Sequence, residues 1–313
     1  MEKKDKILIT GSKGMVGKNL IEKLDNIGYN NLLTPSRKDL DLRERKEVFD
    51  YFNKENPKYV FHLAAKVGGI KANMDFPVEF LQENLLLNTN VIDASYYSKV
   101  KKLVNLGSSC IYPKECFQPM KEESILSGAF ESTNEGYAIS KISSLKLCEF
   151  YNKQYNSNFI SLIPPNMYGK FEKFDEKNSH VLASLLKKFY ESKVDKKGFV
   201  SVWGDGTAKR EFLYAKDMAE ILIFSMDKIN SGDLYEKGFL NCGSSEEISI
   251  ENLARLIKKV VEFEGEIIFD YSKPTGMDRK ILDSSRFLSL GFNKFTSLIG
   301  GIKETYEWYK NLQ

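Results

Sequence analysis

Short apolar runs alternate with amphipathic stretches through the first half of the chain. The apolar runs cover residues 6–10, 31–34, 59–65, 102–108 and 159–164. Continuous apolar runs of this length are typical of strands buried on both faces of a parallel sheet. Helical periodicity fills intervals at residues 17–28, 84–97 and 137–155. This alternation predicts a Rossmann-type α/β fold with a doubly wound parallel sheet.

The pattern loosens after residue 169. Residues 170–179 are polar and mixed in charge, which predicts a loop, and residues 181–190 have the periodicity of an amphipathic helix. A further strand is expected at residues 239–242, and Ser249 is a candidate N-cap for a helix that follows it. We therefore expect a second, smaller C-terminal α/β lobe.

The expected domain boundary lies at residue 170. Residues 1–170 form a Rossmann domain, which a return strand and a helix near residues 210–245 complete. Residues 171–313 form most of the second domain. The sequence contains no low-complexity linker, so we expect the two lobes to pack along a cleft.

Composition and charge narrow the function classes. The 313 residues are 42% hydrophobic, which is enough for a sizeable core. Lys and Arg number 46 against 43 Asp and Glu, a net charge of +3, and the basic residues are scattered between acidic ones. This near balance argues against a nucleic-acid partner. The sequence has neither an apolar run of about 18 residues nor a signal-peptide core, so we expect no membrane partner.

The cysteines and histidines fit neither a disulfide framework nor a zinc site. Four cysteines at positions 110, 116, 148 and 242 are irregularly spaced, and the two histidines are His62 and His180. We therefore predict no metal and a reducing, cytoplasmic location. His62 lies in the middle of an expected strand and is predicted to be a core residue.

A glycine-rich turn follows the first expected strand and precedes a helical stretch. Glycines at this place let the backbone turn sharply and approach a pyrophosphate, and the helix N-terminus favours the anion. The turn therefore predicts a dinucleotide site. Its expected contacts are Gly11, Ser12, Lys13, Gly14, Met15, Val16 and Gly17.

Two cations favour NADP over NAD as the cofactor. Arg37 follows the second expected strand, where dinucleotide-binding proteins hold the adenosine ribose, and Lys13 lies inside the glycine turn. No carboxylate occupies the competing position in the sequence, and the 2′-phosphate of NADP would meet both cations.

A candidate proton-transfer pair lies in the helix over residues 137–155. Tyr137 and Lys141 are one helical turn apart and share a face. A lysine beside a tyrosine lowers the pKa of the phenol towards working pH, so the phenol can exchange a proton with an oxygen at the reacting carbon. Ser108 ends the strand over residues 102–108, at the edge where ligands bind in such sheets.

The glycine turn, Ser108 and the Tyr137 and Lys141 pair together resemble the extended short-chain dehydrogenase/reductase family. Longer segments resemble one group of that family, the GDP-L-fucose synthases, which are GDP-4-keto-6-deoxymannose 3,5-epimerase/4-reductases. These segments cover residues 64–70, 107–114, 178–181 and 210–213, and the similarity extends over nearly the whole chain. The resemblance implies an NADPH-dependent enzyme that epimerises and reduces a GDP-4-keto-6-deoxy sugar to GDP-L-fucose.

The resemblance implies roles for five catalytic residues. Ser108 orients the substrate oxygen, and Tyr137 and Lys141 handle its proton. Cys110 and His180 correspond to the cysteine and the histidine that perform the epimerisations. A 4-keto group acidifies the protons on its two neighbouring carbons, so a thiolate and an imidazolium can remove and return them.

The remaining site residues are implied by the resemblance. For NADP they are Arg37, Asp41, Leu42, Ala64, Leu106, Gly107, Lys141, Pro164, Asn166, Met167 and His180. For the GDP-sugar they are Ser109, Lys188, Trp203, Arg210 and Arg279. The family also implies a homodimer in which the helices over residues 84–97 and 137–155 pair across a two-fold axis.

Several positions depart from the family pattern in segments expected to face the sugar. The departures are Gly136 for a proline, Pro165 for a threonine, Met167 for a leucine, Tyr214 for a histidine and Thr275 for an aspartate. They leave open an alternative, a C4-reductase of a related GDP-4-keto-heptose or 6-deoxy-heptose with no or partial epimerisation. A non-catalytic NADP-binding regulator would not need the proton-transfer residues.

Overall fold

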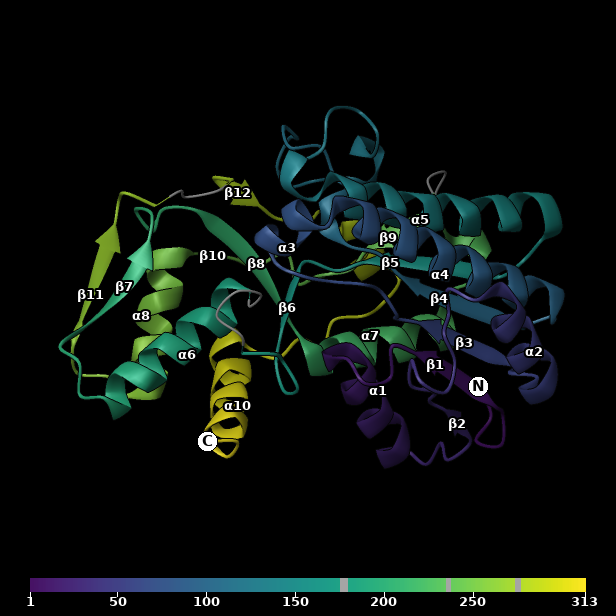
Figure 1. Cartoon of the computed structure of the whole chain (residues 1–313), viewed down its shortest axis with the longest axis horizontal. Coiled ribbons are helices and arrows are strands. Elements are labelled where there is room, and N and C mark those ends of the chain that lie inside the picture. The colour runs from purple at the N-terminus through teal and green to yellow at the C-terminus, as the bar shows by residue number, and fades with distance from the viewer. Residues whose placement is uncertain (175–179, 235–237, 274–276) are drawn as a thin grey trace.

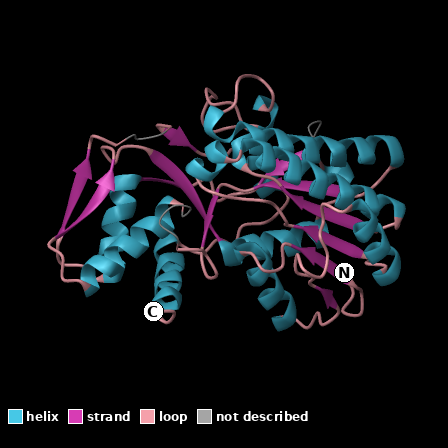
Figure 2. Ribbon diagram, viewed as in Figure 1, coloured by secondary structure: helices cyan, strands magenta, loops and turns pink. Residues whose placement is uncertain are grey.

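The computed structural model describes residues 1–174, 180–234, 238–273 and 277–313. Two lobes lie side by side along the long axis of the molecule (Figure 1). The larger lobe has helices on both faces of a sheet, and the smaller lobe combines short strands with helices (Figure 2).

The strands of the large sheet all run parallel, in the order β2-β1-β3-β4-β5-β9. They are β1 (Ile7–Thr10), β2 (Leu32–Leu33), β3 (Tyr59–His62), β4 (Lys102–Leu106), β5 (Phe159–Ile163) and β9 (Phe239–Asn241). The side chains of β1, β3, β4 and β5 are buried throughout, which explains their continuous apolar runs. The predicted doubly wound α/β fold is confirmed.

Helices cover both faces of this sheet. On one face α1 (Met15–Asn26) packs against α7 (Ala215–Lys228), and on the other α2 (Arg45–Glu55), α4 (Pro77–Tyr97) and α5 (Glu135–Tyr155) pack together (Figure 1). The sequence analysis missed α2 because only Val48 and Phe52 of this helix are buried. It also missed the short α3 (Ile70–Asp75), which precedes α4.

The chain leaves the large sheet through β6 (Asn166–Tyr168), which pairs with β8 (Lys209–Tyr214). In the smaller lobe β8 also pairs with β10 (Glu247–Ser249) and β12 (Arg279–Lys280). A separate pair consists of β7 (Phe199–Trp203) and β11 (Glu266–Asp270). The pairing of β6 with β8 joins the two lobes through backbone hydrogen bonds.

Three helices complete the smaller lobe: α6 (Val181–Val194), α8 (Ile250–Val261) and α10 (Leu298–Lys310). They bury a hydrophobic cluster that includes Phe189 of α6 and Phe212 of β8. The predicted N-cap is confirmed, because Ser249 Oγ accepts a hydrogen bond of 3.1 Å from the backbone N–H of Asn252. The short α9 (Ser285–Ser289) returns to the large sheet, where it packs against β9.

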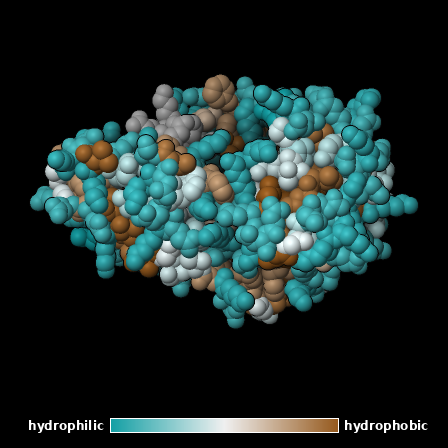
Figure 3. All heavy atoms as spheres, turned by 90° about the horizontal axis from the view of Figure 1, so that it is seen from below, coloured by the Kyte–Doolittle hydropathy of each residue, from teal (hydrophilic) through white to brown (hydrophobic). Residues whose placement is uncertain are grey.

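The surface is mainly polar on the face seen in Figure 3, where hydrophobic atoms form separate groups. Among the helices in the described ranges, none is both long and apolar enough to cross a membrane.

We predict that Gly17→Ala lowers the free energy of unfolding by about 1–3 kcal/mol. A Cβ at Gly17 would lie 2.3 Å from the carbonyl oxygen of Gly11 and 2.8 Å from Cα of Ser12, so the helix must move away from the turn. Urea unfolding measures the loss. Gly232→Ala is the control, because a Cβ there meets nothing within 4 Å. Equal stability of the two variants would contradict the prediction.

Candidate active site

The predicted site segments meet at one edge of the large sheet. Since β1, β3, β4 and β5 run parallel, their carboxyl ends lie at the same edge. The glycine turn follows β1, Ala64 lies just beyond β3, Gly107 follows β4, and Pro164 follows β5. Two predicted strands, over residues 59–65 and 102–108, end earlier than expected, and their last residues are loop segments of this edge.

The glycine turn is held tightly against neighbouring backbone. Gly11 has φ +69°, and a Cβ there would lie 2.8 Å from the backbone nitrogen of Ala64. Ser12 Oγ donates to the carbonyl oxygens of Thr34 and Pro35, both at 3.2 Å. Because α1 begins at Met15, its first N–H groups face the turn. This concave backbone fits the pyrophosphate of a dinucleotide.

Arg37 follows β2 and lies among both acidic and basic side chains. Its guanidinium is 3.5 Å from a carboxylate oxygen of Glu83 and 3.9 Å from one of Asp41. Arg43 and Lys66 also pair with these acids, and they hold the pKa of Asp41 and of Glu83 below the ordinary values. Three cations therefore share these two carboxylates.

Three further predicted cofactor contacts have structural partners. The carbonyl oxygen of Leu42 accepts a hydrogen bond of 3.0 Å from Asn90 Nδ2. Asn166 and Met167 begin β6, where the chain passes from one lobe to the other.

Lys141 is buried under the sheet edge. Its Nζ donates a hydrogen bond of 2.7 Å to the carbonyl oxygen of Leu106 and lies 6.0 Å from the centroid of the Tyr137 ring. Burial lowers the pKa of Lys141 to about 8. The predicted pair on one face of α5 is therefore present, and its ammonium is anchored on the end of β4.

The pKa of Tyr137 differs from our expectation. Burial raises it above the ordinary value, the nearby Cys110 raises it further, and a hydrogen bond with Ser108 acts in the opposite direction. The expected lowering by Lys141 was wrong for this structure, because that ammonium is bonded to Leu106 rather than to the phenol. Tyr137 therefore keeps its proton at neutral pH and is suited to donating it.

Cys110 lies in η1 (Ser109–Ile111), a short helix that begins directly after Ser108, two residues beyond the end of β4. Ser108 Oγ accepts a hydrogen bond of 3.3 Å from the backbone N–H of Cys110 and so caps this short helix. The sulfur accepts hydrogen bonds from Asn134 Nδ2 at 3.4 Å and from Lys280 Nζ at 4.0 Å. The sequence analysis singled out neither donor.

His180 is placed in the other lobe, at the N-cap of α6. Its side chain is 63% exposed, and Nδ1 lies 3.9 Å from Oε2 of Glu172. Burial raises the pKa of Glu172, and the neighbouring His180 acts to lower it. Within the described ranges no hydrogen bond or ion pair joins His180 to Cys110 or Tyr137. Asn178 and Ser179, quoted above for the resemblance, lie outside the described residues.

His62 is a core residue, as predicted, and it fixes the site edge. Thr10 Oγ1 accepts the backbone N–H groups of Leu63 and Ala64, so its own hydrogen goes to Nδ1 of His62 at 2.8 Å. Nε2 of His62 then donates to Asn88 Oδ1 at 2.9 Å. Burial lowers the pKa of His62 to about 3, and it therefore stays neutral. This network ties the ends of β1 and β3 to α4.

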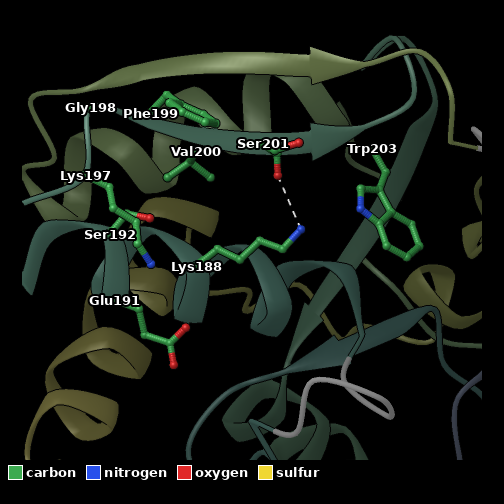
Figure 4. Close-up of a pocket in the computed structure, with 9 residues that line it drawn as sticks. All are labelled: Lys188, Glu191, Ser192, Lys197, Gly198, Phe199, Val200, Ser201 and Trp203. Atoms are coloured by element: carbon green, nitrogen blue, oxygen red, sulfur yellow. Dashed lines mark hydrogen bonds between the residues drawn. The ribbon is translucent and has the colours of Figure 1, made fainter. Parts of the chain in front are cut away.

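Two predicted sugar-nucleotide residues line one cavity of about 370 Å³ in the smaller lobe. In Figure 4 Lys188 reaches along this cavity towards the carbonyl oxygen of Ser201, at 3.3 Å, with Trp203 beyond it. Its Nζ lies 5.5 Å from the Trp203 ring centroid, and burial lowers the pKa of Lys188. Lys273, which the sequence analysis did not propose, lies on the same indole at 5.8 Å.

The other predicted sugar-nucleotide residues lie on β8, on β12 and in η1. Arg210 is half-buried, and burial lowers its pKa while Asp278 acts in the opposite direction. Arg279 Nε donates to Glu247 at 2.6 Å, and Ser109 is buried. Thr275 lies outside the described residues.

Comparison with known proteins places the chain in a family. Residues 7–243 match the model of the NAD dependent epimerase/dehydratase family. The chain belongs to this family. A GDP-L-fucose synthase of Sinorhizobium fredii is 45% identical over 302 residues, which cover 96% of this chain and 94% of that protein. The resemblance to GDP-L-fucose synthases is thereby confirmed.

Two solved structures from Campylobacter jejuni share the fold. A GDP-6-OMe-4-keto-L-xylo-heptose reductase is 34% identical with a TM-score of 0.94, covering 100% of this chain and 99% of that one. A GDP-D-glycero-L-gluco-heptose synthase, in the presence of NADPH, is 36% identical with a TM-score of 0.94, covering 99% of both chains.

We predict that Lys141 makes stability rise with pH above neutrality. Between about 8 and 10.5 the buried amine is neutral in the folded state while the unfolded chain still binds the proton. Relative to Lys141→Met, the free energy of unfolding of the parent should rise across this window by about 1.4 kcal/mol per unit of pKa difference. Urea unfolding without cofactor from pH 7 to 11 measures it. A constant difference between parent and variant would contradict the assignment.

Proposed function

We propose that this protein epimerises a GDP-4-keto-6-deoxy sugar and reduces its C4 ketone with NADPH, giving GDP-L-fucose. The observation that carries the proposal is the placement of Cys110 two residues after Ser108 and beside Tyr137, beyond the carboxyl end of β4. One keto oxygen held by Ser108 and Tyr137 serves both reactions, since epimerisation passes through an enolate at that oxygen. The relative from Sinorhizobium fredii bears the name GDP-L-fucose synthase.

NADPH would lie along the edge formed by the glycine turn and the ends of β3, β4 and β5. The turn holds the pyrophosphate, and Arg37 with Lys13 receives the 2′-phosphate. One Campylobacter jejuni relative was solved in the presence of NADPH. When bound, this cofactor supplies the hydride that reduces the ketone.

The proton-transfer residues act on the keto oxygen. Tyr137 donates its proton to that oxygen as the carbon is reduced, and its raised pKa keeps the proton available. Ser108 holds the same oxygen in place by a hydrogen bond. The buried Lys141 lies one turn away on α5, and its ammonium is held on the carbonyl oxygen of Leu106.

The epimerisation is assigned to Cys110 and His180. The Cys110 thiolate takes a proton from a carbon next to the ketone, the electron pair moves into an enolate, and a proton returns on the other face. His180 acts as the second proton carrier from the start of α6, with Glu172 as its neighbour.

The GDP-sugar would lie between the lobes, with its nucleotide in the smaller one. Lys188 and Arg210 offer charge for the diphosphate, and Trp203 offers an exposed ring face for stacking. We accordingly propose residues 1–170, with the return elements, as the cofactor domain and residues 171–313 as the main part of the sugar domain.

A C4-reductase of a GDP-4-keto-heptose is the second candidate. Both Campylobacter jejuni neighbours carry heptose names and superpose closely on this chain. Two of the departures noted in the sequence do not favour it, however. Tyr214 is buried and donates to Glu304, and a Cβ at Gly136 would meet the carbonyl oxygen of Pro77 in α4, so both positions serve packing rather than the sugar.

We further propose a homodimer in a cytoplasmic setting. The α4 and α5 helices pack together and leave large apolar side chains exposed, among them Leu86 and Tyr97 of α4 and Ile139 and Phe150 of α5. Pairing these two helices across a two-fold axis would bury that surface in a four-helix bundle.

The test of function is product analysis in D₂O with NADPH and GDP-4-keto-6-deoxy-mannose. We expect a GDP-6-deoxy sugar with deuterium on both carbons flanking the reduced carbon. Cys110→Ser should suppress incorporation, because a hydroxyl is a far weaker base than a thiolate, while reduction survives. A parallel run uses a GDP-4-keto-heptose. Deuterium-free product from the parent, with the heptose turned over faster, would establish the second candidate instead.

We predict that Tyr137→Phe lowers kcat for reduction by about 10²–10⁴-fold, because it removes only the proton donor. NADPH binding, followed by fluorescence titration, should stay within a factor of about two, since general acid catalysis rather than binding is lost. The matched control is Tyr155→Phe at the far end of the same helix. Turnover of Tyr137→Phe close to that of the control would refute the role.

A further inference from the structure

Two N–H donors from distant parts of the chain contact the Cys110 sulfur. Asn134 Nδ2 lies 3.4 Å from the sulfur and Lys280 Nζ lies 4.0 Å from it. A thiol can donate its own hydrogen, whereas a thiolate only accepts. Two donors converging on one sulfur therefore suit the thiolate form.

The Asn134 side chain contacts the Cys110 sulfur instead of capping helix α5. It is the N-cap residue of α5, where an asparagine usually accepts a hydrogen bond from the first turn, yet its side chain makes no cap bond. Its Oδ1 is buried and has no hydrogen-bond partner among the described residues. The amide thus forgoes a capping bond while its nitrogen faces Cys110.

Lys280 differs from its cationic neighbours in having no carboxylate partner among the described residues. Lys209 and Arg279 both pair with Glu247, at 3.3 and 2.6 Å. Lys280, half-buried at the end of β12, has the Cys110 sulfur as its polar contact within those same ranges. Its charge is therefore not neutralised by a nearby acid.

Other charged and titratable groups lie around this contact. Tyr137 of α5 faces Cys110 as a protonated phenol, and Lys141 of the same helix is turned to Leu106. Arg210 of β8 is the register partner of Lys280 and adds positive charge one strand away. Glu211, which follows Arg210 on β8, accepts the backbone N–H groups of Ser245 and Leu282, and Asp278 acts on Arg210.

We propose that Lys280 is a positioning residue for Cys110, whose ammonium, together with the Asn134 amide, holds the sulfur as a thiolate aimed at the carbon beside the keto group. This role rests on the proposed epimerisation. Lys280 takes no proton itself: the thiolate forms the S–H bond as the C–H bond breaks, and the ammonium stabilises the anion present before that step.

The test is the pH dependence of Cys110 alkylation by iodoacetamide, read by mass spectrometry of its peptide. Cys116→Ser provides the background, because Cys116 is also accessible while Cys148 and Cys242 are buried. In Lys280→Met the pH midpoint of alkylation should rise by about one unit, the lower end of the shift caused by an opposite charge within 4–6 Å. The rate below the midpoint should then fall about tenfold, and the plateau at high pH should be unchanged.

Two further variants make the result specific. Lys280→Arg keeps the charge and should restore the parent midpoint, which a purely structural role would not require. Lys209→Met removes a lysine of the neighbouring strand that is paired with Glu247 and should leave the midpoint where it was. If Lys280→Met fails to fold, Lys280→Gln takes its place in the comparison.

The alkylation measurement needs no substrate, so its outcome is independent of the proposed function. An unchanged midpoint in Lys280→Met overturns the proposal, and so does a change confined to KM for the GDP-sugar, which would place Lys280 on the substrate. If the midpoint rises as expected, deuterium incorporation in D₂O should slow by the same factor at neutral pH. Absence of deuterium in the parent would refute epimerisation while leaving the thiolate contact established.

Discussion

Parallel pairing in the large sheet is the constraint on which the site depends. Parallel strands have their carboxyl ends at the same edge of the sheet, and the loops that follow the strands gather at that edge. The glycine turn after β1, the Ala64 segment after β3 and the Ser108 segment after β4 thus become neighbours although about fifty residues of chain separate each from the next. The network of Thr10, His62 and Asn88 then fixes that edge with neutral groups, which avoids a buried charge beside Lys141.

Burial sets the chemistry of the groups gathered there. The same loss of water that lowers the pKa of Lys141 raises that of Tyr137, since in each case the charged form is disfavoured. A tyrosine that retains its proton suits reduction of a ketone, in which the oxygen gains a proton as the carbon gains a hydride. The sulfur of the cysteine beside it is contacted by the amide of Asn134 and the ammonium of Lys280.

The sequence predicted much of the larger lobe because its signals are local. Continuous apolar runs identify strands buried on both faces, and the four-residue spacing of Tyr137 and Lys141 places them on one helix face regardless of the rest of the chain. The smaller lobe was predicted less well. In β7 buried and exposed positions alternate over only five residues, and β12 has two residues, so neither carries a periodic signal strong enough to read.

Sequence alone determined the succession of buried strands in the larger lobe, the glycine turn and the catalytic helix, since each depends on residues close together in the chain. Only the tertiary structure decided which side chains contact the residues of these segments. Lys280 contacts Cys110, which lies 170 residues earlier in the chain. The Lys141 ammonium donates to the Leu106 carbonyl oxygen rather than to the phenol. Tyr214, in a segment expected to face the sugar, is a buried packing residue. These contacts join elements that are brought together by packing. The spacing of two residues along the chain does not specify the distance between their side chains in the fold.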